Sequence, residues 1–117
     1  MNEFGTEKIS QEQLNEIAMK IILCAGDGRA LMCEAMEALE NADDLLVDSK
    51  MREAKKKVTE AHNKQTDVIQ KTVMTDDFQP TLLFIHAQDT LMTISSELYL
   101  MENIIRLYRK GISERKL

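Results

Sequence analysis

The chain has 117 residues, a length that fits one domain. Its formal net charge of -5 disfavours a nucleic-acid partner. Glycine (4), proline (1) and aromatic residues (4%) are scarce. Strong helix formers are plentiful, so the composition predicts an all-α protein with a single domain over 1–117 and a core from about residue 10 to 111. No apolar run approaches a membrane span, and the N-terminal sequence lacks a signal-peptide pattern. These observations predict a cytoplasmic protein that does not insert into membranes.

The first predicted helix begins after Ser10, which has a glutamine three residues later, at Gln13, as in a capping box. Apolar or small residues then recur at alternating steps of three and four from Leu14 to Ala42. The stripe passes through the glycine-containing segment 26–28 without losing phase. We therefore predict one continuous helix of about 45 Å. A break at the first glycine is the alternative, because each glycine weakens a helix by roughly 1 kcal/mol relative to alanine.

Two further helices follow. Residues 41–44 supply asparagine and aspartate caps for the second helix, whose apolar stripe runs from Val47 to Val68. The segment 75–80 is typical of a turn, with Pro80 near the first position of the third helix. This third helix is expected to end close to Gly111. Together the three helices predict an antiparallel three-helix bundle.

The third helix carries apolar residues on two sides. One seam is expected to face the core of the bundle: Phe84, Ala87, Leu91, Ile94, Leu98, Met101, Ile105, Tyr108 and Ile112. A second seam follows a neighbouring line: Leu82, Ile85, Asp89, Met92, Ser96, Leu100 and Leu107. A chain of this size has nothing left to cover the second seam, so we predict a homo-oligomer.

The chain has two cysteines, Cys24 and Cys33, nine residues apart in the first helix. This spacing does not match a zinc knuckle or a redox pair. The sequence therefore predicts two reduced thiols in the core.

His86 is the residue best suited to chemistry. A neutral imidazole offers an unprotonated nitrogen near neutral pH, as nucleophilic and proton-transfer reactions require. Asp89 follows three residues later, so the two side chains are neighbours on the surface of the helix. Phosphoryl transfer through a histidine also needs hydrogen-bond donors for the phosphoryl oxygens, and Gln88 and Thr93 are candidates.

Other roles for these residues stay open at this level. A histidine on a helix is more often structural than catalytic, and a His-x-x-Asp pair can also bind a metal. The paired Glu-x-x-His motifs of di-iron bundles are missing from the sequence. The second histidine, His62, is expected to make a polar contact or to be exposed, rather than to be a second nucleophile.

Three segments resemble one known family. The stretch His86-Ala87-Gln88-Asp89, followed by Leu91-Met92-Thr93, resembles the active-site helix of the lactose/cellobiose-type (also chitobiose) IIA component of the bacterial sugar phosphotransferase system. The segment 25–31 is similar to the small-Gly-Asp-small-Arg segment of that family, and 60–66 is similar to its Ala-His-x-x-Gln-Thr segment. The resemblance covers roughly residues 10–110.

The resemblance implies a homotrimer and a phosphocarrier. His86 would accept a phosphoryl group from phospho-HPr and pass it to a cysteine of the IIB component, which phosphorylates a disaccharide entering through the membrane component IIC. Asp89 matches an aspartate that gathers at the trimer axis, commonly around a divalent cation such as Mg²⁺. No organic cofactor is implied. A hard cation with oxygen ligands would relieve the repulsion of three converging carboxylates.

The sequence departs from the family at Thr90, where a second histidine is usual. The nucleophile remains, but one imidazole near it is lost. This difference leaves the transported sugar open and keeps an alternative in view, in which the chain is a helical interaction or regulatory module without efficient phosphotransfer.

Overall fold

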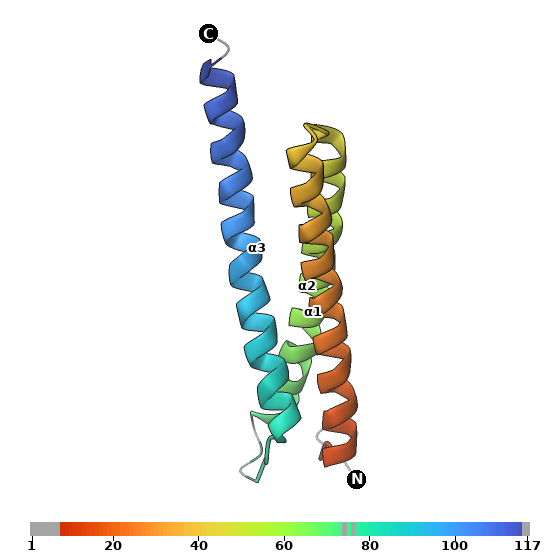
Figure 1. Ribbon diagram of the computed structural model, residues 1–117. Helices are drawn as coiled ribbons and strands as arrows, with labels where there is room; N and C mark the ends of the chain where they lie inside the picture. Colours follow the sequence, from red (N-terminus) through yellow and green to blue (C-terminus); the bar gives the residue numbers. More distant parts are fainter. Residues whose placement is uncertain (1–7, 74, 76, 116–117) are drawn as a thin grey trace.

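The computed structural model contains three long α-helices in an up-down-up arrangement: α1 (Gln11–Glu40), α2 (Asp44–Thr72) and α3 (Leu82–Arg115). It describes residues 8–73, 75 and 77–115. The helices lie side by side in an elongated body with extents of 67 × 23 × 20 Å, and α3 reaches beyond the α1–α2 hairpin at its C-terminal end (Figure 1). The described residues contain no strand, so the predicted all-α three-helix architecture is confirmed.

The capping box predicted at the start of α1 is present. The backbone N–H of Gln13 donates to the Ser10 hydroxyl at 3.0 Å, and the backbone N–H of Ser10 donates to the Gln13 side chain at 2.9 Å. The helix continues to Glu40 without a break at Gly26. The prediction of one continuous helix is therefore confirmed, and the alternative of a break is wrong.

The second glycine of α1 lies where α1 and α2 are in close contact. A Cβ atom on Gly28 would be 2.9 Å from Val58 Cγ2 and 3.3 Å from the Ala54 carbonyl oxygen, whereas a Cβ atom on Gly26 would have no neighbour within 4 Å. A methyl group at the first of these distances is closer than atoms normally pack. Gly28 therefore permits the close contact between the two helices.

Helix α2 begins at one of the predicted caps, and α3 begins and ends at sites that the sequence located less well. The Asp43 side chain accepts a hydrogen bond from the Leu46 N–H at 3.2 Å, and the Thr81 hydroxyl does the same for Phe84 at 3.1 Å. The predicted end of α3 close to Gly111 is wrong by about one turn, because the helix continues to Arg115. A single glycine costs a helix only about 1 kcal/mol, too little to force an end.

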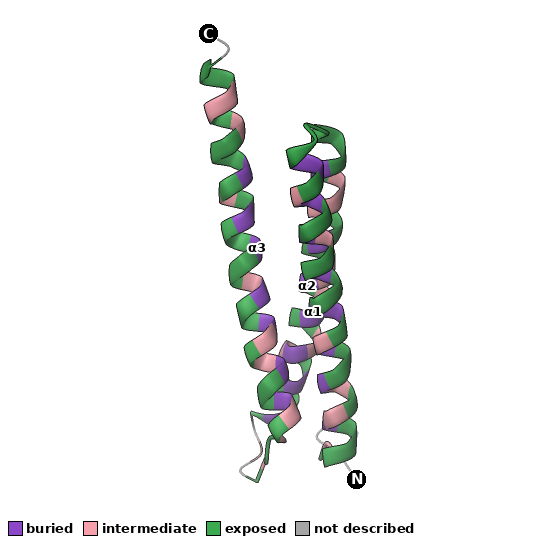
Figure 2. Cartoon of the chain, viewed as in Figure 1, coloured by how far each residue is buried: buried purple, intermediate pink, exposed green. Residues whose placement is uncertain are grey.

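The core lies between the three helices, and the buried residues of α3 lie along the side that faces the α1–α2 hairpin (Figure 2). Most of the first seam of α3 is buried, from Phe84 to Ile105. At its far end Tyr108 is 48% exposed, because α3 there extends past most of the hairpin. Helix α3 packs more extensively on α1 than on α2.

The second seam of α3 lies in solvent. We call its exposed apolar side chains the apolar face of α3: Leu82, Ile85, Met92, Leu100 and Leu107. Each of them is between 42% and 83% exposed. A row of exposed apolar side chains along one helix is typical of a surface that contacts another chain. Within the described ranges, no helix has the length and hydropathy needed to cross a membrane.

The two cysteines differ in burial. Cys24 is buried and its thiol contacts the Lys57 carbonyl oxygen (3.4 Å) and Glu60 Oε2 (3.3 Å), whereas Cys33 is exposed. The prediction of two core thiols is thus wrong for Cys33. Nine residues correspond to two and a half turns of helix, which places the two side chains on opposite sides of α1.

Candidate functional site

His86 lies in the second turn of α3, and its side chain is exposed to solvent. Glu97 follows eleven residues later, which is close to three full turns, so both side chains leave α3 in nearly the same direction. Glu97 pairs with Arg29 of α1. The histidine therefore lies on the side of α3 that borders α1, and we call the line through His86, Thr93 and Glu97 the His86 flank.

Gln88 and Thr93 are placed differently with respect to the imidazole. Gln88 is half-buried and two residues from His86, so it points about 200° away around the helix. Thr93 is exposed and lies on the His86 flank, but about 10 Å further along the axis. Within one protomer neither side chain is adjacent to the histidine. We call the line through Gln88, Ser95 and Tyr99 the Gln88 flank.

Asp89 is also exposed and belongs to the same side of α3 as Ile85 and Met92, within the apolar face. Among the described residues no hydrogen bond joins it to His86, although both residues are accessible. The carboxylate thus stands alone on an apolar surface of the protomer, where an approaching second chain would desolvate it.

Thr90 does not offer its hydroxyl to the imidazole. Its Oγ1 donates to the backbone carbonyl oxygen of His86 at 2.9 Å. Such back-bonding is common for threonine within helices. The Thr90 hydroxyl is therefore hydrogen-bonded to the backbone of its own helix.

The sequence did not predict the ion pair between Arg29 and Glu97. The guanidinium donates from Nε to Oε1 at 2.8 Å and from its terminal nitrogen to Oε2 at 3.1 Å. This hydrogen bonding raises the pKa of Arg29 above its ordinary value. Both side chains are nearly half exposed, so the pair adds little to stability but ties the two helices together at one point. The eleven-residue interval between His86 and Glu97 indicated on which side of the third helix Glu97 lies, but it did not identify Arg29 as the partner of Glu97.

His62 is exposed on α2. It lies seven residues, or about two turns, after Lys55, which pairs with Glu102 of α3 at 3.7 Å. His62 thus faces the groove between α2 and α3, whereas His86 borders α1. The two imidazoles are on different sides of α3 in one protomer and do not form a single site.

The described part of the chain holds no cluster of three or more His, Cys, Asp or Glu side chains able to bind a metal ion. Asp89 is a hard oxygen donor of the kind that Mg²⁺ prefers. As a single carboxylate it fits such an ion only if copies of the chain bring several of these residues together.

These features define a small three-helix protein with one exposed histidine on the flank of its third helix and an uncovered apolar face beside it. The chain belongs to the family described as "PTS system, Lactose/Cellobiose specific IIA subunit", whose model matches residues 16–109. Members of this family are phosphotransfer components of sugar uptake systems. The name of the family agrees with the resemblance found in the sequence.

Individual relatives support the assignment. The lichenan-specific phosphotransferase enzyme IIA component of Bacillus subtilis is 34% identical over 104 residues, covering 89% of this chain and 94% of its own. The crystal structure of PtcA from S. mutans superposes with a TM-score of 0.80 at 30% identity, over 86% of this chain and 98% of its own. The Escherichia coli IIA(Chitobiose) in its complex with HPr gives a TM-score of 0.73 at 28% identity, over 83% and 94%.

Proposed function

We propose that this protein is a phosphohistidine carrier of a phosphotransferase system for a disaccharide of the cellobiose, lactose or chitobiose class. His86 accepts the phosphoryl group from phospho-HPr and passes it to a cysteine of the IIB component, which serves the membrane component IIC. The observation that carries this proposal is the exposed imidazole of His86 on α3, in a chain of this family. A relative solved in complex with HPr supports the choice of donor.

The chemistry requires little from the acceptor beyond access. A neutral imidazole nitrogen attacks phosphorus, the phosphorus–nitrogen bond of phospho-HPr breaks, and its electron pair returns to the histidine of HPr. The second transfer repeats this exchange with a thiolate as the nucleophile. An exposed side chain that makes no hydrogen bond to the described residues can meet both partner proteins in line.

We further propose that the chain works as a homotrimer in which the apolar faces of three parallel α3 helices meet around one axis. In such a ring the His86 flank of one copy meets the Gln88 flank of the next. Gln88 then stands beside the histidine of its neighbour at the same height, and its amide donates to the phosphoryl oxygens. The supporting role predicted for Gln88 is thereby assigned to a neighbouring copy.

The same assembly gathers three copies of Asp89 at the axis. Three carboxylates in an apolar surrounding repel one another, and a divalent cation, of which Mg²⁺ is the expected one, offsets this repulsion through oxygen ligands. This role belongs to assembly, and the phosphoryl transfer does not pass through the ion.

The test is phosphoryl transfer from labelled phosphoenolpyruvate through enzyme I and HPr to this protein. We expect an acid-labile, base-stable label on the natural protein and none on a His86→Gln variant with unchanged helicity. His62→Gln is the matched control, because it removes the other exposed imidazole and is expected to label normally.

Two outcomes would refute the proposal. A label lost with His62 rather than His86 would place the nucleophile on α2. No label on any folded form, with donors proven active on another IIA protein, would favour the alternative of an interaction or regulatory module without efficient phosphotransfer.

A further inference from the structure

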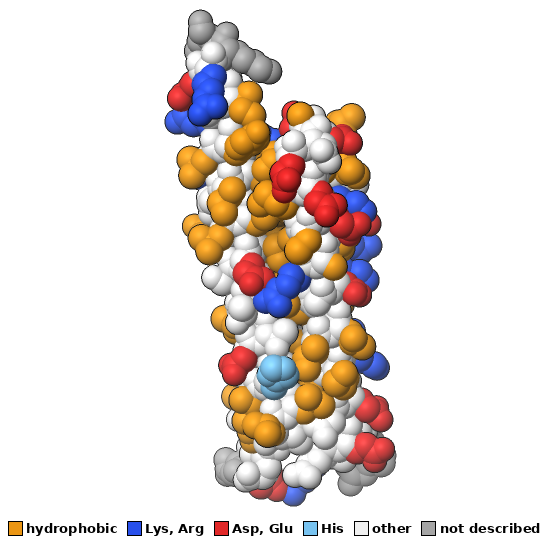
Figure 3. Space-filling view, in the orientation of Figure 1, with side chains coloured by type: hydrophobic (Ala, Val, Ile, Leu, Met, Phe, Trp, Pro, Cys, Tyr) orange, Lys and Arg blue, Asp and Glu red, His pale blue; other side chains and the backbone are white. Residues whose placement is uncertain are grey.

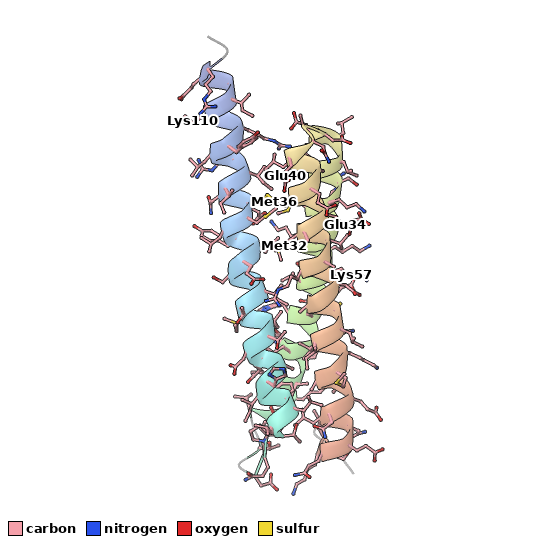
Figure 4. All side chains as sticks on the ribbon, in the orientation of Figure 1. Met32, Glu34, Met36, Glu40, Lys57 and Lys110 are labelled. Atoms are coloured by element: carbon pink, nitrogen blue, oxygen red, sulfur yellow. The ribbon has the colours of Figure 1, made fainter. Side chains whose placement is uncertain are left out.

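A hollow of about 340 Å³ lies between α1 and α3, beyond His86 along the bundle. Its lining is mostly sulfur and carbon: Arg29, Met32, Cys33, Met36, Glu97 and Met101. Figure 4 shows Met32 and Met36 in the space between the two helices, and Figure 3 shows hydrophobic side chains gathered there and along the outer edge of α3. The two charged members, Arg29 and Glu97, bind each other, so the hollow offers no free charge to a ligand.

Tyr99 is the large side chain at the same height on the opposite side of α3. It is 67% exposed and two residues from both Glu97 and Met101, so it points about 200° away from the hollow. It also lies eleven residues after Gln88 and therefore extends the Gln88 flank in the same direction. One flank of α3 thus carries a protruding aromatic ring, and the other borders a methionine-lined depression.

We propose that Tyr99 of one copy enters the hollow of the next copy in the assembled ring. The inference rests on the homotrimer of the proposed function, because rotation about the apolar face is what brings the two different flanks together. Because the protrusion and the depression lie on different flanks of α3, they favour a heterologous contact, in which two different surfaces meet, over a two-fold dimer, in which identical flanks would meet.

The chemistry of the hollow suits this occupant. Methionine sulfur makes favourable contacts with aromatic rings and its flexible chain adapts to the shape of the guest. A tyrosine ring is neutral, and its hydroxyl reaches polar groups at the rim, which the carboxylate of Glu97 provides. The contact lies three turns from His86, so it fixes one protomer against the next without touching the reacting group.

Photocrosslinking tests the contact directly. Tyr99 is replaced by p-benzoylphenylalanine, whose excited ketone inserts preferentially into methionine C–H bonds. A mixture of isotopically light and heavy chains is irradiated, and cross-linked peptides are identified by mass. We expect mixed light–heavy products that join position 99 to peptides containing Met32, Met36 or Met101.

A second tyrosine of α3 is the matched control. Tyr108 is nine residues from Tyr99, half a turn out of phase, and it lines a different hollow with Leu39 of its own chain. The same probe at position 108 is expected to give products within one chain, to α1. Mixed products that join position 99 to position 99 would instead indicate a two-fold contact and overturn the inference.

Substitution gives an independent readout. Tyr99→Ala is expected to raise the dissociation constant of the assembly at least tenfold, and Tyr99→Phe to leave it within about threefold. A natural protein that stays monomeric at all concentrations would refute both the trimer and this contact. A trimer that is phosphorylated on His86 but gives no methionine cross-link from position 99 would refute the contact alone.

Discussion

The hydroxyl of Thr90 donates its hydrogen bond to the backbone carbonyl oxygen of His86, one turn earlier on α3, at 2.9 Å. The Thr90 hydroxyl is therefore bonded to the helix backbone and makes no hydrogen bond to the imidazole of His86. In the proposed carrier, Thr90 is a neutral replacement that neither assists nor obstructs the nucleophile.

Thr90→Val tests this interpretation. Valine keeps the shape of the side chain and removes only the hydroxyl, so the rate of phosphoryl acceptance from phospho-HPr is expected to stay within about threefold of the natural protein. Stopped or quenched single-turnover labelling measures this rate. A loss of tenfold or more, with unchanged circular dichroism, would mean that the hydroxyl takes part in the transfer.

The two glycines of α1 provide a matched pair for stability. Gly28→Ala places a methyl group 2.9 Å from Val58 Cγ2, and we expect it to lower the free energy of unfolding by about 1–3 kcal/mol through overpacking. Gly26→Ala meets nothing within 4 Å and should raise it by up to about 1 kcal/mol through helix propensity. Urea unfolding at one fixed protein concentration compares the variants. Equal effects of the two substitutions would contradict the close contact of α1 with α2 at residue 28.

Asp89→Leu exchanges a solitary carboxylate on the apolar face for an apolar side chain. The proposed trimer is expected to persist in this variant, and to dissociate at the same or a lower protein concentration than the trimer of the natural chain, because a buried charge costs more than leucine. Sedimentation equilibrium with and without a chelator measures both forms. Dissociation of the variant into monomers would show that the carboxylate holds the assembly together.

The Arg29–Glu97 pair is half exposed, at 47% and 45% of its side chains. Glu97→Gln should therefore cost less than about 1 kcal/mol of stability at low salt, and the difference should shrink further at 1 M salt through screening. Thermal unfolding of the isolated protomer at two ionic strengths measures this effect. A cost that is large and independent of salt in the protomer would contradict the half-exposed position of the pair.

The thiol of Cys24 provides a pH-dependent prediction. Burial, and then its hydrogen bond to Glu60, raise the pKa of Cys24 above the ordinary thiol value of 9.0. The folded protein holds this proton to a higher pH than the unfolded chain does, so unfolding becomes more favourable as pH rises above that value. Denaturation between pH 7 and 10 should show this decline in the free energy of unfolding, and Cys24→Ala should reduce the decline.

The two thiols should also differ in reactivity. Below the unfolding transition, iodoacetamide should modify the exposed Cys33 long before the buried Cys24; the reverse order would be inconsistent with their burial.

The sequence predicted most of what depends on local chemistry. The capping box at Ser10 and the cap at Asp43 each involve residues within one turn of each other, and the unbroken stripe of α1 depends on steps of three or four residues. The exposed second seam of α3 was also predicted, because a single helix period reveals it. The prediction for Cys33 failed although its nine-residue spacing from Cys24 already placed the two thiols on opposite sides of a helix. The pairing of Arg29 with Glu97, 68 residues apart, could not be predicted, because it requires the setting of α3 on α1.

The candidate site divides in the same way. His86, Asp89 and Thr90 could be located from a short motif because they lie within five residues of each other. The two-residue spacing of Gln88 from His86 already implies nearly opposite directions on a helix, and the prediction of Gln88 as a donor within one chain did not take this into account.

The unequal packing of the three helices has a consequence for local opening. Helices α1 and α2 hold each other closely around Gly28, whereas α3 lies mainly on α1 and carries its remaining apolar side chains in solvent. Amide hydrogens of α3 are therefore expected to exchange with solvent faster than those of the hairpin in the isolated protomer. In the proposed trimer, whose contacts centre on α3, the same amides are expected to gain more protection than those of the hairpin. Protection of α3 is therefore expected to depend more strongly on protein concentration than that of the hairpin.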